Sequence, residues 1–185
     1  PYQHRIGGLM ETGSSTKRLA IFAYGSLLFR PGFAYLERQR AVLRGYARSF
    51  TQASPDHRGT PAQPGRVVTL VASTESVAVG ALYFVPAPAI QLLLELDERE
   101  RAGYERVLLT VSTDVETLQA VTWIAPPGNA YDAGHLPSAE LAAYMLNCVG
   151  PSGPNDDYGF QLARALAALG DRAPQVSDLA ERLRR

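Results

Sequence analysis

IFAYGSLLFRPGF, residues 21–33, is the stretch on which the fold prediction rests, because an apolar run breaks there into glycine and serine. The run RLAIFAY (residues 18–24) predicts an interior strand. Its end at Tyr24-Gly25-Ser26-Leu27 predicts an elbow, since glycine lets the chain turn and neighbouring backbone N–H groups can then attract a carboxylate or oxyanion. A plain strand-to-loop turn is the alternative that an isolated Tyr-Gly-Ser leaves open.

The composition favours one compact domain that handles a small molecule. The chain has 185 residues, is 46% hydrophobic, and balances 18 basic residues against 18 acidic ones. A length in this range suits a single domain. A net charge of zero provides no field that would recruit nucleic acid or an anionic membrane, so we expect neither as a partner. A neutral or zwitterionic small ligand fits better.

Cysteine usage and hydropathy indicate a cytoplasmic protein. Cys148 is the single cysteine, which excludes an internal disulfide framework and a cysteine-based metal cluster. We see neither an apolar run of eighteen residues nor a signal peptide. Residues 1–18 are polar and rich in Gly and Ser, and we expect a flexible leader or cloning remnant there, with the single domain at 19–185.

Periodicity predicts an α+β domain. Strands are expected at residues 41–52, 66–73, 77–85, 104–113 and 118–125, with 66–73 and 77–85 as neighbours and the last two paired. Helices are expected at residues 86–100, 138–149 and 156–169, the last two capped by Ser138 and Asn155, with Gly170 as a stop. About six strands and then two or three helices predict a mixed or mostly antiparallel sheet that can close as a barrel.

The long polar loop at residues 54–70 contains Asp56, His57, Arg58 and Arg66. Rigid polar loops often carry function. Arg58 or Arg66 could pair with a substrate carboxylate, or brace the loop against Asp56. We expect His57 to make a loop-fixing hydrogen bond, because the chain offers too few partners for a metal site.

Two further segments could contribute reactive groups. In ELDERERAGYERV five carboxylates crowd a helix end, and most belong to a solvated surface: Glu95, Asp97, Glu98, Glu100 and Glu105. Because Ala102-Gly103-Tyr104 ends the helix, one carboxylate could be carried inward and act as a general base. GPSGPNDDYGF is either a tight connector with a helix cap, or a helix start where Tyr158 donates a hydrogen bond to a bound anion.

Taken together, these segments resemble the ChaC family, the glutathione-specific γ-glutamylcyclotransferases. The resemblance runs through IFAYGSLLFRPGF, GYARSF, DHRGTPAQPGRVVTL, LDERERAGYERV and GPSGPNDDYGFQLA, in order, across nearly all of residues 19–185. It implies the γ-glutamylcyclotransferase-like fold, a small mixed β-barrel flanked by helices. It also implies cleavage of glutathione to 5-oxoproline and cysteinylglycine without a cofactor or metal.

The resemblance also implies a set of site residues. Glu100, four residues before Tyr104, matches the family's catalytic glutamate. The elbow matches the loop that holds the γ-glutamyl group, and the adjoining strand end should line the same pocket. The expected substrate-binding residues are Ile21, Phe22, Ala23, Tyr24, Gly25, Ser26, Leu27, Arg58, Tyr104 and Tyr158.

Two alternatives remain open from the sequence. The chain could be a cyclotransferase for another γ-glutamyl amine. It could instead be a non-enzymatic γ-glutamyl-binding regulator of a partner such as a cation transporter. In either enzymatic case we expect a small-molecule substrate and a monomer or weak dimer.

Overall fold

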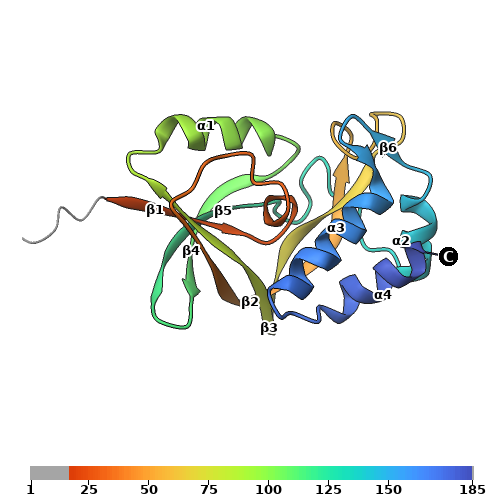
Figure 1. The fold of residues 1–185 in the computed structure, drawn as a ribbon. Helices are drawn as coiled ribbons and strands as arrows, with labels where there is room; N and C mark the ends of the chain where they lie inside the picture. Colours follow the sequence, from red (N-terminus) through yellow and green to blue (C-terminus); the bar gives the residue numbers. More distant parts are fainter. Residues whose placement is uncertain (1–16, 185) are drawn as a thin grey trace, which may run out of the picture.

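The computed structural model describes residues 17–184 and contains a closed five-stranded barrel beside a layer of helices (Figure 1). The elements are β1 (Arg18–Ala23), the 3₁₀ turn η1 (Ser26–Leu28), β2 (Glu37–Ser54), β3 (Gly65–Pro86), α1 (Ile90–Arg99), β4 (Glu105–Ser112), β5 (Thr117–Ile124), α2 (Ser138–Met145), β6 (Val149–Gly150), β7 (Gly153–Pro154), α3 (Asn155–Ala168) and α4 (Pro174–Leu183). Of the predicted leader, residues 1–16 lie outside the described part of the chain, and Arg18 is the first residue of β1.

The barrel has the strand order β1-β3-β2-β4-β5 and closes where β5 runs parallel to β1, at Ile21 and Val121. The remaining pairings are antiparallel, including β4 with β5 as predicted. The α+β prediction with a mixed barrel flanked by helices is therefore confirmed. In the described residues, no helix is both long enough and apolar enough to cross a membrane.

The prediction of separate strands at 66–73 and 77–85 is wrong, because both belong to the 22-residue strand β3. β3 pairs with β2 on both sides of a register shift, at which residues 73–76 lie opposite Gly45. Gly45 has φ +81°, a left-handed conformation that glycine adopts without steric cost. The polar residues of this segment therefore form a bulge in the β2–β3 ladder and do not turn the chain back. The hydroxyls of Ser73 and Ser76 hydrogen-bond to each other at 2.7 Å.

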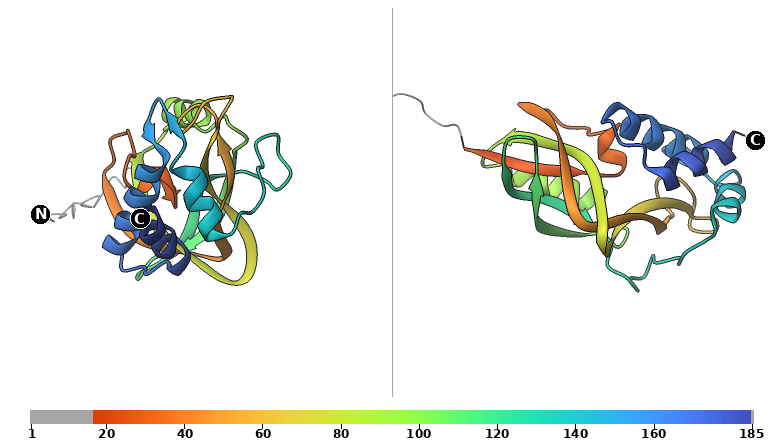
Figure 2. Two further views of the ribbon diagram at one scale, coloured as in Figure 1. Left: turned by 90° about the vertical axis from the view of Figure 1, so that its right-hand side faces the viewer. Right: turned by 90° about the horizontal axis from the view of Figure 1, so that it is seen from below.

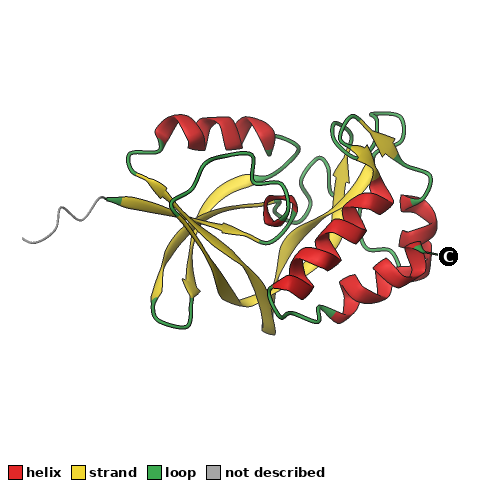
Figure 3. Cartoon of the chain, in the orientation of Figure 1, coloured by secondary structure: helices red, strands yellow, loops and turns green. Residues whose placement is uncertain are grey.

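The second half of β2 and the first half of β3 extend past the barrel and form a two-stranded ribbon beside the helices. The pairs there run from Tyr46 opposite Ala72 to Ser54 opposite Gly65. Figures 1 and 2 show this ribbon running alongside α3, with α2, α3 and α4 gathered at the end of the molecule away from β4 and β5. Figure 3 shows α1 lying apart from those helices, over the barrel.

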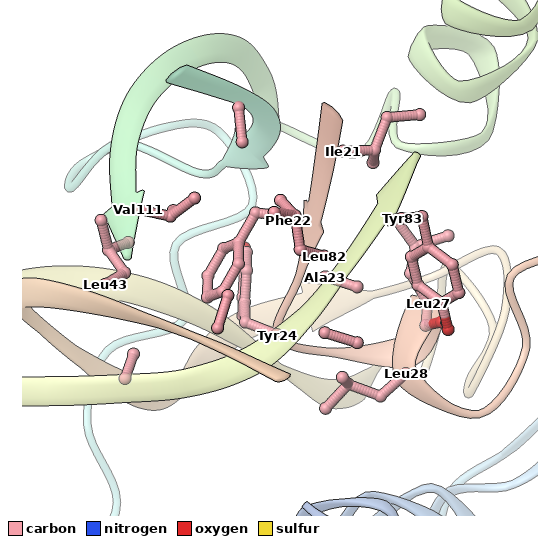
Figure 4. Packing of buried hydrophobic residues seen from close by; sticks show 14 of the residues in the cluster. Ile21, Phe22, Ala23, Tyr24, Leu27, Leu28, Leu43, Leu82, Tyr83 and Val111 are labelled. Carbon is pink, nitrogen blue, oxygen red and sulfur yellow. The ribbon is translucent and has the colours of Figure 1, made fainter. Parts of the chain in front are cut away.

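The barrel interior is filled by apolar side chains from every strand. Phe22 is 1% exposed, and Figure 4 shows it beside Leu43, Leu82 and Val111. Gly80 makes this packing possible, because a Cβ there would lie 2.6 Å from the Phe22 ring and 2.3 Å from the Ala23 carbonyl oxygen. The ring therefore fixes the end of β1, from which the elbow departs.

α3 ends as predicted, but the prediction that the preceding helix extends to residue 149 is wrong, because α2 ends at Met145 and Val149 belongs to β6. The helix α4 was not predicted, and the predicted helix starts also differ. Gly170, with φ +74°, follows α3 as the expected stop. Pro137 and Pro154 occupy the N-cap positions, and neither helix has a side-chain cap, so the predicted caps Ser138 and Asn155 are wrong. Both side chains serve tertiary contacts instead: Ser138 donates to Asp178 at 2.5 Å, and Asn155 bonds to the backbone of β3.

Asn155 fastens α3 to the ribbon. Its Oδ1 accepts from the Arg66 backbone N–H at 2.7 Å, and its Nδ2 donates to the Arg66 carbonyl at 2.9 Å. Asn155 is completely buried, so both backbone groups of Arg66 would lose their partner if the amide were removed.

We expect Asn155→Ala to lower the free energy of unfolding by about 2–4 kcal/mol, because two buried backbone groups would be left unpaired. Urea denaturation at 25 °C measures the change. Asn147→Ala is the matched control, since Asn147 is exposed and bonds only to Ala143 of its own helix region. A loss for Asn155→Ala no larger than that of the control would contradict the proposed fastening role.

Candidate active site

A cavity of about 90 Å³ opens where the barrel meets the ribbon and α3. Its walls come from the end of β1, η1, the β2–β3 loop, the end of α1, the end of β5 and α3. The lining residues are Phe22, Ala23, Tyr24, Gly25, Ser26, Leu27, Phe29, Arg30, Ala53, Ser54, His57, Arg58, Val67, Val68, Arg99, Glu100, Ala102, Tyr104, Thr122, Trp123, Ser152 and Tyr158. The cavity thus brings together every predicted site residue except Ile21.

Ile21 does not line the cavity. Its side chain is fully buried in the hydrophobic core, and Figure 4 shows it directed away from Phe22. Ile21 lies further from the elbow than Phe22 and Ala23, where β1 is paired with both β3 and β5, so the core encloses its side chain. The expectation that Ile21 contributes to the pocket wall is therefore wrong.

The predicted elbow, Tyr24 to Leu27, leads into the 3₁₀ turn η1 and overlaps it at Ser26 and Leu27. Leu28 N–H donates to the Gly25 carbonyl at 3.0 Å, so the amides of Ser26 and Leu27, the first two of the turn, have no acceptor within it. A Cβ on Gly25 would lie 3.1 Å from Val68 Cγ2 and 3.4 Å from the Tyr158 hydroxyl, a close approach that favours glycine.

Two side chains from neighbouring strands hold the elbow in place. Arg48 of β2, which is nearly buried, donates from Nε to the Tyr24 carbonyl at 2.8 Å. Tyr83 of β3 donates its hydroxyl to the Leu27 carbonyl at 3.0 Å. The elbow is therefore fixed on both sides of Gly25.

Glu100 follows directly after α1 and is largely buried, with a side chain 17% exposed. Burial raises the pKa of the Glu100 carboxyl above its ordinary value, and Asp56 raises it further. Arg99 and His57 lower the pKa of Glu100 and oppose that effect. The net result is a carboxyl whose pKa is moved toward neutrality, as a group that both takes up and releases a proton requires.

Two buried tyrosines, Tyr24 and Tyr158, and the partly buried Tyr104 lie near Glu100. Tyr24 donates to the Trp123 carbonyl at 2.7 Å, and Tyr104 donates to the Val68 carbonyl at 2.6 Å. The Tyr158 hydroxyl instead accepts from the Val68 N–H at 3.3 Å, so its own hydrogen remains available for a bound molecule. Burial raises the pKa of all three phenols, which keeps them protonated.

The loop residues divide between bracing and lining. Arg58 is 4% exposed and pairs with Asp157 at 3.1 Å, so the bracing partner is not Asp56. It also donates to the Pro154 carbonyl at 2.9 Å, which joins the loop to α3. Arg66 donates to Gly134 and Ala133 carbonyls outside the cavity.

His57 makes the predicted loop-fixing contacts. Its Nδ1 lies 3.3 Å from Ser152 Oγ, and its Nε2 lies 3.4 Å from the Arg99 carbonyl. Among residues 17–184, no group of three or more His, Cys, Asp and Glu side chains is arranged to hold a metal ion.

Sequence reasoning missed Arg99. It lines the cavity, its Nε lies 3.4 Å from Glu100 Oε1, and its Nη2 donates to Ser26 Oγ at 3.0 Å. The available signal was its position beside Glu100 at the end of an amphipathic helix. Within an acidic stretch, an arginine is more simply explained by surface charge balance.

Comparisons with known proteins agree with this geometry. Gamma-glutamylcyclotransferase 2-3 of Arabidopsis thaliana is 37% identical over 174 residues, which cover 89% of this chain and 87% of that protein. The human protein named glutathione-specific gamma-glutamylcyclotransferase 1 is 36% identical over 166 residues, covering 86% of this chain and 73% of its own.

A solved structure has the same fold. The crystal structure of a γ-glutamyl cyclotransferase specific to glutathione from yeast superimposes with a TM-score of 0.81 at 26% identity, covering 91% of this chain and 98% of that one. The family model described as ChaC-like protein matches residues 19–185. With that match over nearly the whole chain, and with relatives above 30% identity, the chain belongs to the ChaC family.

Proposed function

We propose that this chain is a γ-glutamylcyclotransferase that cleaves glutathione to 5-oxoproline and cysteinylglycine. The family and the names of its relatives indicate this reaction class. The observation that carries the proposal is the placement of Glu100, a buried carboxyl with a raised pKa, in the same cavity as the elbow. A carboxylate there could also pair with the α-ammonium in a non-enzymatic module, so turnover, and not binding, distinguishes the two.

The reaction brings its own nucleophile. The α-amine of the γ-glutamyl group attacks the γ-amide carbonyl, a carbon–nitrogen bond forms to close a five-membered ring, and the bond to the cysteine nitrogen breaks. Holding amine and carbonyl in attack geometry can contribute roughly 7–11 kcal/mol in favourable intramolecular cases. We assign that positioning to the elbow at Tyr24, Gly25, Ser26 and Leu27, with Tyr158 as a hydrogen-bond donor.

Glu100 is proposed as the general acid and base. As a carboxylate it takes one proton from the substrate's α-ammonium, which frees the nitrogen lone pair for attack. It then delivers that proton to the departing cysteine nitrogen, which regenerates the carboxylate. The attacking nitrogen loses a second proton to become the ring N–H, and the released amine takes up one proton to become an ammonium, so the protons balance. Proton transfer by a positioned group typically contributes on the order of 10²–10⁴-fold.

Negative charge grows on the γ-carbonyl oxygen as the ring closes. The backbone N–H groups of Ser26 and Leu27 are the donors proposed to stabilise it, since preorganised amides act strongly in a cavity with little water. The Ser26 hydroxyl needs no nucleophilic role. It accepts a hydrogen bond from Arg99, which leaves its own hydrogen to donate.

We further propose a cytoplasmic location and a monomer or weak dimer. Cys148, the single cysteine, is buried and free, which suits a reducing compartment. Sedimentation of the purified protein would establish its state of assembly.

Incubation with reduced glutathione should yield 5-oxoproline and cysteinylglycine in equal amounts, detected by chromatography. Glu100→Gln should lower the turnover by about 10²–10⁴-fold, because the amide cannot carry the proton. Glu98→Gln is the matched control: Glu98 lies in the last turn of α1, two residues before Glu100, is 72% exposed, and pairs with Arg101, so its replacement should leave turnover unchanged.

Undiminished turnover in Glu100→Gln would remove Glu100 from the mechanism. Release of 5-oxoproline from another γ-glutamyl amide, but not from glutathione, would instead identify a cyclotransferase with a different substrate. Binding of glutathione without any product, measured by calorimetry, would favour the regulator alternative.

The same substitution should change how stability depends on pH. The folded protein holds the Glu100 proton above the carboxyl's ordinary pKa of 4.5, so the stability due to the protonated form is lost as the pH rises through the folded-state pKa. Glu100→Gln removes this loss. Urea unfolding at a series of pH values should show the variant gaining stability relative to wild type from pH 4.5 toward neutrality, and a constant difference would contradict the burial of an ionisable group.

A further inference from the structure

Arg99 connects the two halves of the cavity. It is the last residue of α1, and its guanidinium reaches from the helix end to the segment that follows the elbow. Nη1 donates to the carbonyls of Arg30 at 2.9 Å and Pro31 at 3.0 Å, and Nη2 donates to Ser26 Oγ at 3.0 Å. Nε lies 3.4 Å from Glu100 Oε1. The planar guanidinium of Arg99 therefore contacts both the elbow and the proposed base.

These contacts determine whether the Ser26 hydroxyl donates or accepts toward Arg99. An arginine has donors only, so Ser26 Oγ must act as the acceptor toward Arg99. The hydroxyl hydrogen is then free to point toward a bound carbonyl or carboxylate. Without Arg99, the hydroxyl could rotate and accept from the substrate's ammonium instead.

Arg99 also affects the protonation of Glu100. It is the largest of the charged influences on the Glu100 pKa, and it favours the ionised carboxylate against the effect of burial. The other charged or titratable groups that face this region include His57, Asp56 and Arg58 of the β2–β3 loop, Arg30 after the elbow, and the phenols Tyr24, Tyr104 and Tyr158.

We propose that Arg99 is a positioning residue for this reaction, whose guanidinium holds the Ser26 hydroxyl and the Glu100 carboxylate in fixed relation across the substrate cavity. The inference rests on the proposed function and extends it by a residue between the two parts of the site. A purely structural role is the competing explanation, because the two carbonyl contacts could serve only to fasten the chain at Arg30 and Pro31 to α1.

The experiment compares Arg99→Met with Arg99→Lys. The Glu100 carboxyl is followed directly by ¹³C NMR in protein labelled at the glutamate δ-carbon, with Glu100→Gln used to assign its signal. Arg99→Met should move the Glu100 titration to higher pH, because the neighbouring cation is gone. Arg99→Lys should leave the titration near that of wild type, since it keeps a positive charge but not the planar fork.

Steady-state kinetics with glutathione then test the positioning. Both variants should lower kcat by on the order of 10²-fold, as small misplacements of reacting groups do, with a much smaller change in KM. Ser26→Ala should reduce kcat in the wild-type background and add little in the Arg99→Met background, because the two side chains act as one unit.

Arg44→Met is the control. Arg44 lies on β2, is exposed, and is not among the residues that line the cavity, so the variant removes an arginine without changing the site. Its Glu100 titration and its kcat should equal those of wild type. Thermal unfolding monitors the folding of every variant.

The outcomes separate the possibilities. An unchanged Glu100 titration in folded Arg99→Met, or full activity in Arg99→Lys, would overturn the proposal and leave Arg99 a structural fastener. Because the NMR titration needs no turnover, it tests Arg99 even if the wild-type protein releases no 5-oxoproline, a result that would count against the proposed function instead.

Discussion

The length of the β2–β3 pair is the constraint on which the rest of the structure depends. β1, β4 and β5 have six to eight residues, whereas β2 and β3 have 18 and 22. The barrel can use only part of the longer strands, so the remainder must bury its apolar face elsewhere, and α3 packs beside it (Figure 1). The cavity lies at this junction, where the end of β1 meets the ribbon and the first turn of α3. Asn155 and Arg58 each tie α3 to the β2–β3 side of that junction, so the site's walls depend on the same contacts that join barrel and helices.

Glu100 shows how this arrangement balances stability against reactivity. A carboxyl at the end of an exposed helix would have an ordinary pKa and little capacity to exchange protons near neutral pH. Burial raises the pKa of Glu100, and it lowers the stability of the protein when the carboxyl is ionised. Arg99 limits that loss of stability because it favours the ionised form. The two effects oppose each other, so the carboxyl can be buried and still ionise. Active sites commonly contain such unfavourable groups, because function and not stability selects them.

Much of the fold and part of the site could be predicted from the sequence. The elbow and the helix end at Glu100 each produce a local signal, a strand broken by glycine or a change of period, and both lie where predicted. The failures share one cause, which is dependence on distant partners. The polar residues 73–76 predict a turn locally, yet pairing with β2 on both sides keeps β3 continuous. The local sequence predicts Asn155 as a helix N-cap, yet its side chain hydrogen-bonds to the backbone of Arg66. Arg99 carries no signal of its own, because its role depends on where Ser26 is placed by a different part of the chain.

The distribution of hydrogen bonds in the cavity also explains why this reaction suits the site. Tyr24 and Tyr104 have given their hydroxyl hydrogens to backbone carbonyls, and Arg58 is held by Asp157. These groups form part of the cavity wall, and the hydrogen bonds and the ion pair named here already occupy them. A substrate that needed an enzyme nucleophile would require a serine or cysteine beside a general base, and here the side-chain partner of Ser26 Oγ is Arg99, which has donors only and cannot take up the hydroxyl proton. A γ-glutamyl amide carries its own amine, so it needs only a fold that bends it, donors for one oxygen and a single carboxyl to exchange protons with the two nitrogens. The groups left uncommitted in this cavity match those three requirements.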